Sequence, residues 1–356
     1  MNNESGFQRI PPAPDVLAQL YAEYLRKRNQ GTGSKLSFKE YLARIGFVKK
    51  EEPLPGRDMG RPMKASHSMQ LVSVPKRTIT GRLNVLVLLV DFDDNPAFRP
   101  KREYEDMLFS NGSYLTGSLR DYYKEVSNGK VTVGGTVHGW YRMPKPYAHY
   151  VGDDSGCGTY PTNAQALAQD ALKAALRKRV AFPGTLDKLG NGSITALVIV
   201  HAGRGAEVMT SRPMQRTRIW SHKGDMPEPF KVKKDLFATN YLTVLEDCRM
   251  GVCAHELGHL AFQWDDFYDP NYDQDGSEWA GAGNWDLMAG GSWNDGGNTP
   301  ARPAGLHLAQ HKWVKVVDIT ATKRGIKLPP YDKSKAVILR VRSEAYSSTQ
   351  CLIIEN

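Results

Sequence analysis

The chain of 356 residues is poor in cysteine and has no long apolar run. Its four cysteines are too few and too scattered for a disulfide scaffold or a CxxC metal site, although a bridge from Cys157 to Cys248 stays open. No stretch approaches the ~20 apolar residues of a membrane span. The first residues, MNNESGFQRIPPAP, also lack the apolar core of a signal peptide. We therefore expect no membrane span.

Acidic residues are scarce at the front of the chain. The net charge is +9, and residues 1–77 hold 14 Lys/Arg against 7 Asp/Glu. A basic excess can mark a nucleic-acid surface, but these charges are scattered and no base-stacking or groove-reading motif accompanies them. We expect a solvated front segment and no nucleic-acid partner. The remainder, with 40% hydrophobic residues in the whole chain, suffices for a sizeable core.

The motif with the clearest chemistry is H-E-x-x-H, formed by His255, Glu256 and His259. Four residues along an α-helix turn through about 400°, so both imidazoles leave one face and can bind one metal ion. A catalytic zinc takes three protein ligands and one water, and Glu256 would accept the proton of that water. The pattern predicts a zinc hydrolase of peptide or amide bonds. An acidic run that begins at Asp265 follows within reach of the same ion.

The remaining patterns predict a helical front segment and an α+β sheet domain. Asp15 is a candidate cap for a first helix, and Ser37 with Glu40 forms a capping box for a second. Residues 49–77 are rich in Pro and Gly and predict a linker. Buried strands are expected at 85–90 and within ITALVIVHAGRG at 194–205, with a helix opened by a Thr162/Gln165 capping box between them. This alternation predicts an α+β, α/β-like sheet domain.

Several stretches resemble the immune inhibitor A family of secreted bacterial metallopeptidases, within the metzincin clan. Those that carry the resemblance are HELGH, WDDFYD at 264–269, NWDLMAGGSW at 284–293, LVLLVDFDD, SLRDYYKEVSNGKV, ALVIVHAGRGAE and IWSH. The resemblance implies a helical prosegment and linker at 1–80 and a catalytic domain at 81–320. The residues at 321–356 predict a β-rich part that ends inside an apparent strand, as a truncated module would. It also implies a twisted mixed sheet with a backing helix and an active-site helix, and Met288 in the Met-turn below a Zn²⁺ ion.

The resemblance leaves the third zinc ligand open. The clan spacing places it at Asp265, ten residues after the first histidine. The clan's glycine position, however, holds Phe262, and a bulky residue adopts a left-handed helix exit only at a cost. Asp266, Asp269 and Glu278 are therefore alternatives.

The resemblance further implies a secreted, monomeric endopeptidase with protein substrates, made as a latent zymogen. A carboxylate can occupy the water position of a zinc site, so Asp58 in GRDMGRPM is a candidate for the block. Lys49-Lys50 and Lys76-Arg77 are candidate release sites. The run NYDQDGSE resembles the front of a calcium loop, which makes Ca²⁺ a second candidate ion, although Ala282 stands at its twelfth position. A catalytically silent domain that binds or supports other proteins is the alternative function.

Overall fold

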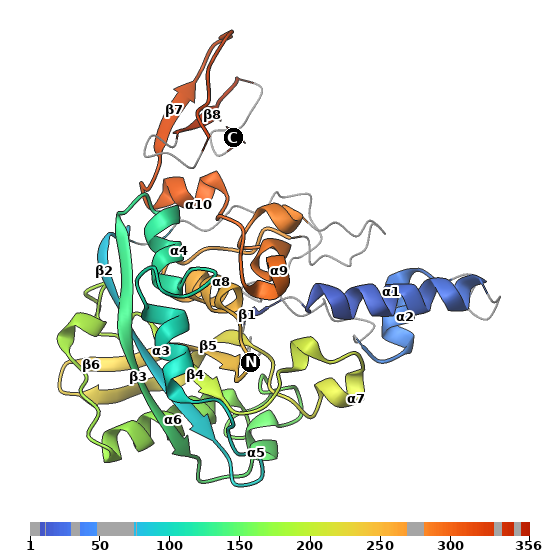
Figure 1. Ribbon diagram of the computed structural model, residues 1–356, viewed down its shortest axis with the longest axis vertical. Helices are drawn as coiled ribbons and strands as arrows, with labels where there is room; N and C mark the ends of the chain where they lie inside the picture. Colours follow the sequence, from blue (N-terminus) through green and yellow to red (C-terminus); the bar gives the residue numbers. More distant parts are fainter. Residues whose placement is uncertain are drawn as a thin grey trace.

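A six-stranded mixed sheet lies at the centre of the computed structural model (Figure 1). The structure describes residues 8–10, 12–29, 36–47, 75, 77–268, 281–330, 337–344 and 350–356. The sheet has the strand order β1-β5-β6-β4-β2-β3. Its strands are β1 (Gln8–Arg9), β2 (Gly81–Asp91), β3 (Val131–Arg142), β4 (Leu197–His201), β5 (His222–Lys233) and β6 (Leu236–Leu245).

The strands change direction near one edge of this sheet. β2 runs parallel to both β3 and β4, and β4 runs parallel to β6. β5 is antiparallel to β6, and the two-residue β1 pairs antiparallel with β5 on its outer side. The twisted mixed sheet predicted from the sequence is therefore confirmed. Apart from β1, β5 is the edge strand on this side of the sheet among the described residues.

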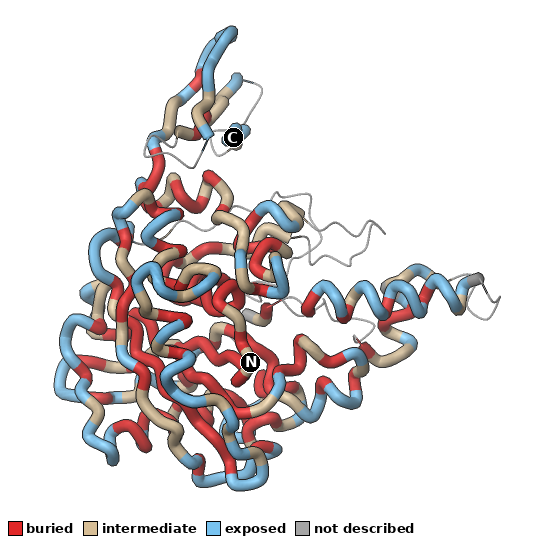
Figure 2. Tube along the Cα trace, viewed as in Figure 1, coloured by how far each residue is buried: buried red, intermediate tan, exposed pale blue. Residues whose placement is uncertain are grey.

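Helices cover both faces of the sheet. Leu83, Val85, Val87 and Leu89 of β2 share one apolar cluster with the helices α3 (Lys101–Phe109), α4 (Leu119–Val126) and α8 (Met250–Leu260). Leu86, Leu88 and Val90 share the other with α5 (Tyr147–Val151) and α6 (Ala164–Arg177). Figure 2 shows the buried strands between these two layers. Burial on both faces explains why the 85–90 run is apolar without alternation.

Of the helix caps predicted from the local sequence, one is observed and two are not. Ser37 and Glu40 form the predicted capping box of α2 (Phe38–Arg44). Asn128 and Gly129, in the turn between α4 and β3, both have positive φ. The cap of α6 is Asn163 and not Thr162, because the Asn163 side chain accepts the backbone N–H groups of Gln165 and Ala166. Asp15 does not cap α1 (Pro14–Asn29), since it lies inside the first turn.

The two front helices pack on each other and on the sheet domain. Their shared cluster contains Ala13, Val16, Leu20, Tyr24, Tyr41, Leu42 and Phe47. Val208 in the 3₁₀ helix η2 (Ala206–Val208) and Trp293 in η4 (Gly290–Trp293) pack against this cluster. In Figure 1 the pair projects to one side of the sheet domain. η4 packs on α8, and Glu207 of η2 is close enough to Glu256 on α8 for its charge to act on that carboxyl.

A second, three-stranded sheet follows the main domain (Figure 1). The helix α10 (Gly305–Gln310) leads into β7 (Lys315–Ile319), which pairs parallel with β8 (Val337–Val341). β9 (Leu352–Ile354) completes this sheet antiparallel to β8. The shorter elements are η1 (Gly184–Leu186), α7 (Arg212–Gln215), η3 (Gly283–Trp285) and α9 (Asn294–Gly297). Within the described parts of the chain, no helix is both long and apolar enough to cross a membrane.

Replacing Gly251 by alanine is expected to destabilise the fold. This residue lies in the first turn of α8, and an added Cβ would come within 2.1 Å of the carbonyl oxygen of Ser292. Because that oxygen belongs to the backbone, α8 or η4 must move. We expect a loss of about 2–3 kcal/mol in the free energy of unfolding, measured by urea denaturation. Gly184→Ala is the matched control, since nothing lies within 4 Å of its added Cβ. Equal stability of the two variants would contradict this packing.

Candidate metal centre

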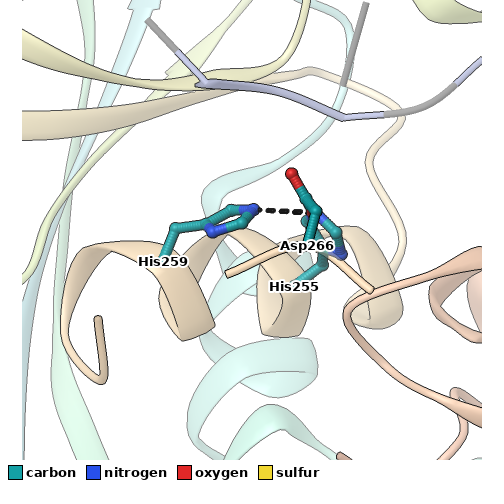
Figure 3. A group of neighbouring side chains, drawn as sticks. All are labelled: His255, His259 and Asp266. Carbon is teal, nitrogen blue, oxygen red and sulfur yellow. Dashed lines mark hydrogen bonds and ion pairs between the residues drawn. The ribbon is translucent and has the colours of Figure 1, made fainter. Parts of the chain in front are cut away.

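Three side chains with metal-binding atoms converge at α8 (Figure 3). His255 and His259 project from the same face of the helix, and their Nε2 atoms are 3.1 Å apart. Asp266, from the segment after the helix, places Oδ1 at 3.3 Å from Nε2 of His255 and 3.2 Å from Nε2 of His259. All three side chains are almost fully withdrawn from solvent.

Backbone carbonyls fix both imidazoles in the orientation that a metal needs. Nδ1 of His255 lies 2.9 Å from the oxygen of Leu287, and Nδ1 of His259 lies 2.7 Å from that of Trp264. A carbonyl can only accept, so each Nδ1 carries the proton and donates it. The Nε2 atom of each neutral ring is therefore the one with a free electron pair. Such second-sphere hydrogen bonds are typical of metal-binding histidines.

The third member of the group is the carboxylate of Asp266, one residue after the position expected from the clan spacing. Asp265 does not belong to the three-residue group. After α8 the chain takes a left-handed conformation at Gln263, which has φ of 57°, and not at Phe262. Trp264 then donates its backbone N–H to the oxygen of Gly258 at 3.1 Å. The left-handed residue is thus Gln263, one position after the clan's glycine position at 262. The carboxylate that lies beside the histidines is shifted by the same single residue, from Asp265 to Asp266.

Packing of Phe262 explains the late turn. Its side chain is completely buried. The ring lies 4.9 Å from that of Tyr123 and 5.0 Å from those of Trp264 and Trp313. A bulky residue is strained at positive φ, and here it keeps ordinary backbone angles while its ring fills the core. The more exposed Gln263 takes the left-handed conformation instead.

Glu256 lies on α8 between the two histidines and is fully buried. Neither of its oxygens has a hydrogen-bond partner among the described residues. Burial raises the pKa of Glu256 to about 8; the charge of His255 lowers it, and those of Asp266 and Glu207 raise it further. Burial would also raise the pKa of Asp266, but its interactions with the imidazoles of His259 and His255 outweigh it, and the net shift is downward.

The donor set fits a zinc ion. Donors that sit 2.0–2.1 Å from a tetrahedral zinc are about 3.3 Å apart, and the three distances here are 3.1, 3.2 and 3.3 Å. Two imidazoles and one carboxylate are also ligands that zinc accepts. Buried carboxylate oxygens on Asp266 and Glu256 have no hydrogen-bond partner within the described ranges, which is costly unless a cation or water binds there.

The Met-turn lies directly below the helix. Met288 is fully buried, and a Cβ added to Gly258 would come within 2.7 Å of its sulfur and 3.0 Å of the Trp264 ring. The glycine of HELGH thus permits this close approach. Met288 is not a member of the three-residue group. Its position agrees with a packing role, as the Met-turn resemblance implies.

Two supporting residues are absent from the sequence-based prediction. Asp286 accepts the backbone N–H groups of Met288 at 3.1 Å and Ala304 at 2.9 Å, which ties the Met-turn to the segment before α10. Its spacing of two residues from Met288 is that of an Asx turn and could have revealed it. Glu207 accepts hydrogen bonds from the backbone N–H and hydroxyl of Ser221, and burial raises its pKa. No local pattern points to Glu207.

Other predicted residues lie outside the described residues. These are the alternative ligands Asp269 and Glu278, the calcium-like run at 271–276, the blocking candidate Asp58, and Lys49, Lys50 and Lys76 of the release sites. Cys157 and Cys248 are both described, and both are free thiols, so no bridge joins them.

Comparison with known proteins places these features in one family. The family model described as "Immune inhibitor A peptidase M6, catalytic domain" matches residues 80–318. The protein named "Immune inhibitor A" from Bacillus thuringiensis subsp. alesti is 30% identical over 302 residues, which is 69% of this chain and 43% of that protein. "Pre-pro-metalloprotease PrtV" from Vibrio cholerae serotype O1 (strain M66-2) is 30% identical over 255 residues, 59% of this chain and 27% of that protein.

A third relative is named "Putative secreted metallopeptidase" and comes from Arthroderma benhamiae (strain ATCC MYA-4681 / CBS 112371). It is 26% identical over 247 residues, which is 58% of this chain and 33% of that protein. The chain thus spans less than half the length of each of these curated relatives.

Proposed function

Because this chain belongs to the immune inhibitor A (M6) family of peptidases, we propose that it is a zinc-dependent endopeptidase that hydrolyses peptide bonds of protein substrates. The observation that carries the proposal is the convergence of His255, His259 and Asp266, with the unpaired carboxylate of Glu256 beside them. A catalytically silent domain is the second candidate, and it would not need to keep all four of these groups.

The roles follow from the geometry of the four side chains. His255, His259 and Asp266 hold the ion, and Asp266 replaces Asp265 in the proposed ligand set. Zn²⁺ in such a site is a Lewis acid that makes water a nucleophile near neutral pH. Glu256 accepts the proton of the attacking water and passes it to the leaving amine. The buried surroundings of Glu256 suit this role, since they raise its proton affinity towards the working pH.

We further propose that residues 1–80 keep the chain latent, ahead of a catalytic domain at 81–320 and a β-rich part at 321–356. β1 occupies the outer edge of β5, where an extended substrate could add as a strand. The front helices rest on Val208 of η2 and Trp293 of η4. In Figure 3 the front segment crosses above the histidines. The family also supports secretion and protein substrates, and we propose a monomer.

The deciding experiment combines metal analysis with casein cleavage. After limited proteolysis has released the front segment, the protein should contain one zinc per chain and cleave casein. Incubation with 1,10-phenanthroline should remove the zinc and abolish cleavage, and added Zn²⁺ should restore it. The non-chelating 1,7-phenanthroline is the control. A protein that binds no zinc, or that cleaves equally well without it, would refute the proposal.

Replacing Leu20 by aspartate should weaken latency. Leu20 is buried in the cluster that joins the two front helices to the catalytic region, and a charge there requires the cluster to open. Each 1.4 kcal/mol lost from docking raises the released fraction tenfold. We expect the unprocessed variant to cleave casein about tenfold faster than the unprocessed wild type. Gln19→Asp, which adds the same charge on the exposed face of α1, should leave the rate unchanged. Equal rates in both variants would argue against latency by docking.

A further inference from the structure

The front segment binds to the sheet edge as a short extended peptide. Arg9 pairs with His222 of β5, and the backbone N–H of Ile10 donates to the oxygen of Ser221 at 3.1 Å. The indole N–H of Trp220 donates to the oxygen of Ile10 at 2.8 Å. Peptides that add to a sheet edge gain affinity from main-chain hydrogen bonds and specificity from pockets for their side chains. One such pocket holds the side chain of Arg9.

The Arg9 guanidinium is surrounded by three acceptors. Nε donates to Sγ of Cys157 at 3.1 Å. Nη2 donates to Oδ2 of Asp154 at 2.5 Å and to the backbone oxygen of the same residue at 3.3 Å. The Arg9 side chain is only 16% exposed, so the contacts are largely shielded from solvent. Charge-assisted hydrogen bonds of this kind are about twice as strong as neutral ones.

Asp154 is the acidic acceptor of the pocket, because the neighbouring thiol of Cys157 and ring of His222 are both neutral. Burial raises the pKa of the Cys157 thiol to about 11, despite the nearby charge of Arg9, so the thiol is neutral. Burial lowers the pKa of His222 to about 3, so the ring, whose Nδ1 lies 3.7 Å from Sγ of Cys157, is also neutral. Arg212 places Nη2 at 3.7 Å from Oδ1 of Asp154. Arg212 thus faces one oxygen of the carboxylate and Arg9 binds the other.

The acceptors of Arg9 lie near the proposed catalytic carboxylate and outside the front segment. Cys157 is close enough to Glu256 for the charge of that carboxylate to raise the pKa of the thiol. The backbone amide of Lys223, which follows His222 on β5, makes no hydrogen bond of normal geometry to Glu256 but is close enough to lower the pKa of that carboxyl. Asp154, Cys157 and Arg212 all lie inside residues 80–318, the part matched by the family model. The acceptors therefore belong to the proposed catalytic domain and not to the front segment.

We propose that the pocket formed by Asp154, Cys157 and His222 is a substrate subsite for a basic side chain, with arginine preferred over lysine. This inference rests on the proposed function, because it takes Arg9 as the stand-in for a residue of a substrate. Arginine is preferred because the acceptors engage both Nε and Nη2, and a lysine ammonium cannot reproduce this fork.

Peptide binding tests the pocket without any need for catalysis. The protein carries Glu256→Gln, which prevents turnover, and its front segment is removed by limited proteolysis, because the main-chain bonds of residues 8–10 otherwise occupy the edge of β5. The probe is a fluorescent peptide with the sequence of residues 5–14, carrying arginine, lysine or citrulline at the position of Arg9. Citrulline keeps the shape of arginine and lacks its charge. We expect the arginine peptide to bind about tenfold or more tighter than the citrulline peptide, with lysine between them. Equal affinity for arginine and citrulline, or no binding, overturns the proposal.

Variants of the pocket residues test whether Asp154 causes the preference for the arginine peptide over the citrulline peptide. Asp154→Asn in the same protein should reduce the arginine-to-citrulline ratio towards one, whereas Asp153→Asn, the same change at the exposed neighbour, should preserve it. Thermal unfolding checks that each variant is folded. If Asp154→Asn does not fold, Cys157→Ala serves instead, because it removes the acceptor of Nε alone and should lower the ratio by a smaller factor. A ratio unchanged in the folded pocket variants overturns the proposal.

Cleavage-site mapping separates this proposal from the proposed function. The processed chain, with and without Asp154→Asn, is given a library of proteome-derived peptides, and the products are sequenced by mass spectrometry. Arginine should be enriched several-fold at one fixed distance from the cleaved bond, and Asp154→Asn should abolish this enrichment. Cleavage without any such enrichment overturns the subsite and leaves the peptidase intact. Absence of all cleavage refutes the peptidase, and the binding ratio then decides whether the pocket recognises a guanidinium.

Discussion

Replacing Asp266 by alanine should weaken zinc binding by about 100-fold or more and reduce casein cleavage to background. The carboxylate of Asp266 supplies one of the three donors that converge among the described residues, at 3.2–3.3 Å from the two imidazole nitrogens. Loss of a residue that merely supports a metal ligand costs 10–100-fold in metal affinity, and loss of a ligand itself should cost at least as much. Competition with a chromophoric chelator measures the affinity directly.

Asp265→Ala is the matched control, because it removes the adjacent carboxylate from the position that the clan spacing predicts. Asp265 does not belong to the converging group, so we expect its zinc affinity to stay within a few-fold of the wild type. The pair of variants distinguishes two registers that differ by a single residue. If Asp265→Ala lost the zinc and Asp266→Ala kept it, the late turn at Gln263 would not describe the metal-bound protein.

Periodicity and spacing were sufficient to predict those parts of the structure that depend on local sequence. The i, i+4 spacing of His255 and His259 predicts their common face, and the structure places both Nε2 atoms together. The apolar run at 85–90 predicts a strand buried on both sides, as observed in β2. The Ser37/Glu40 capping box holds because it needs only residues within one turn.

Features that depend on side-chain packing could not be predicted in this way. The register of the third ligand is set by the fit of the Phe262 ring between Tyr123 and Trp313, which come from distant parts of the chain. The pairing of Arg9 with His222 crosses more than 200 residues and leaves no periodic trace in either segment. A spacing rule taken from relatives fails where one residue is too large for the backbone angle that the rule assumes.

Replacing Glu256 by glutamine should lower kcat for casein by roughly 10³-fold while the zinc stays bound. Glutamine keeps the size of the side chain but cannot accept the proton of the attacking water, and general-base catalysis contributes about 10²–10⁴-fold. Glu256 is buried without a hydrogen-bond partner in the described parts of the chain. Removing its charge should therefore leave the thermal unfolding midpoint unchanged or higher.

Glu207→Gln is the comparison that assigns this loss to proton transfer. Glu207 is also a buried glutamate, and its charge contributes to the raised pKa of Glu256, but its own carboxylate is engaged by Ser221. We expect this variant to lose stability and less than about tenfold in kcat, because no reacting group depends on its proton. Activity in Glu256→Gln above a tenth of the wild type, or an equal loss in Glu207→Gln, would remove Glu256 from its proposed role. Zinc content measured on the same samples excludes loss of the metal as the cause.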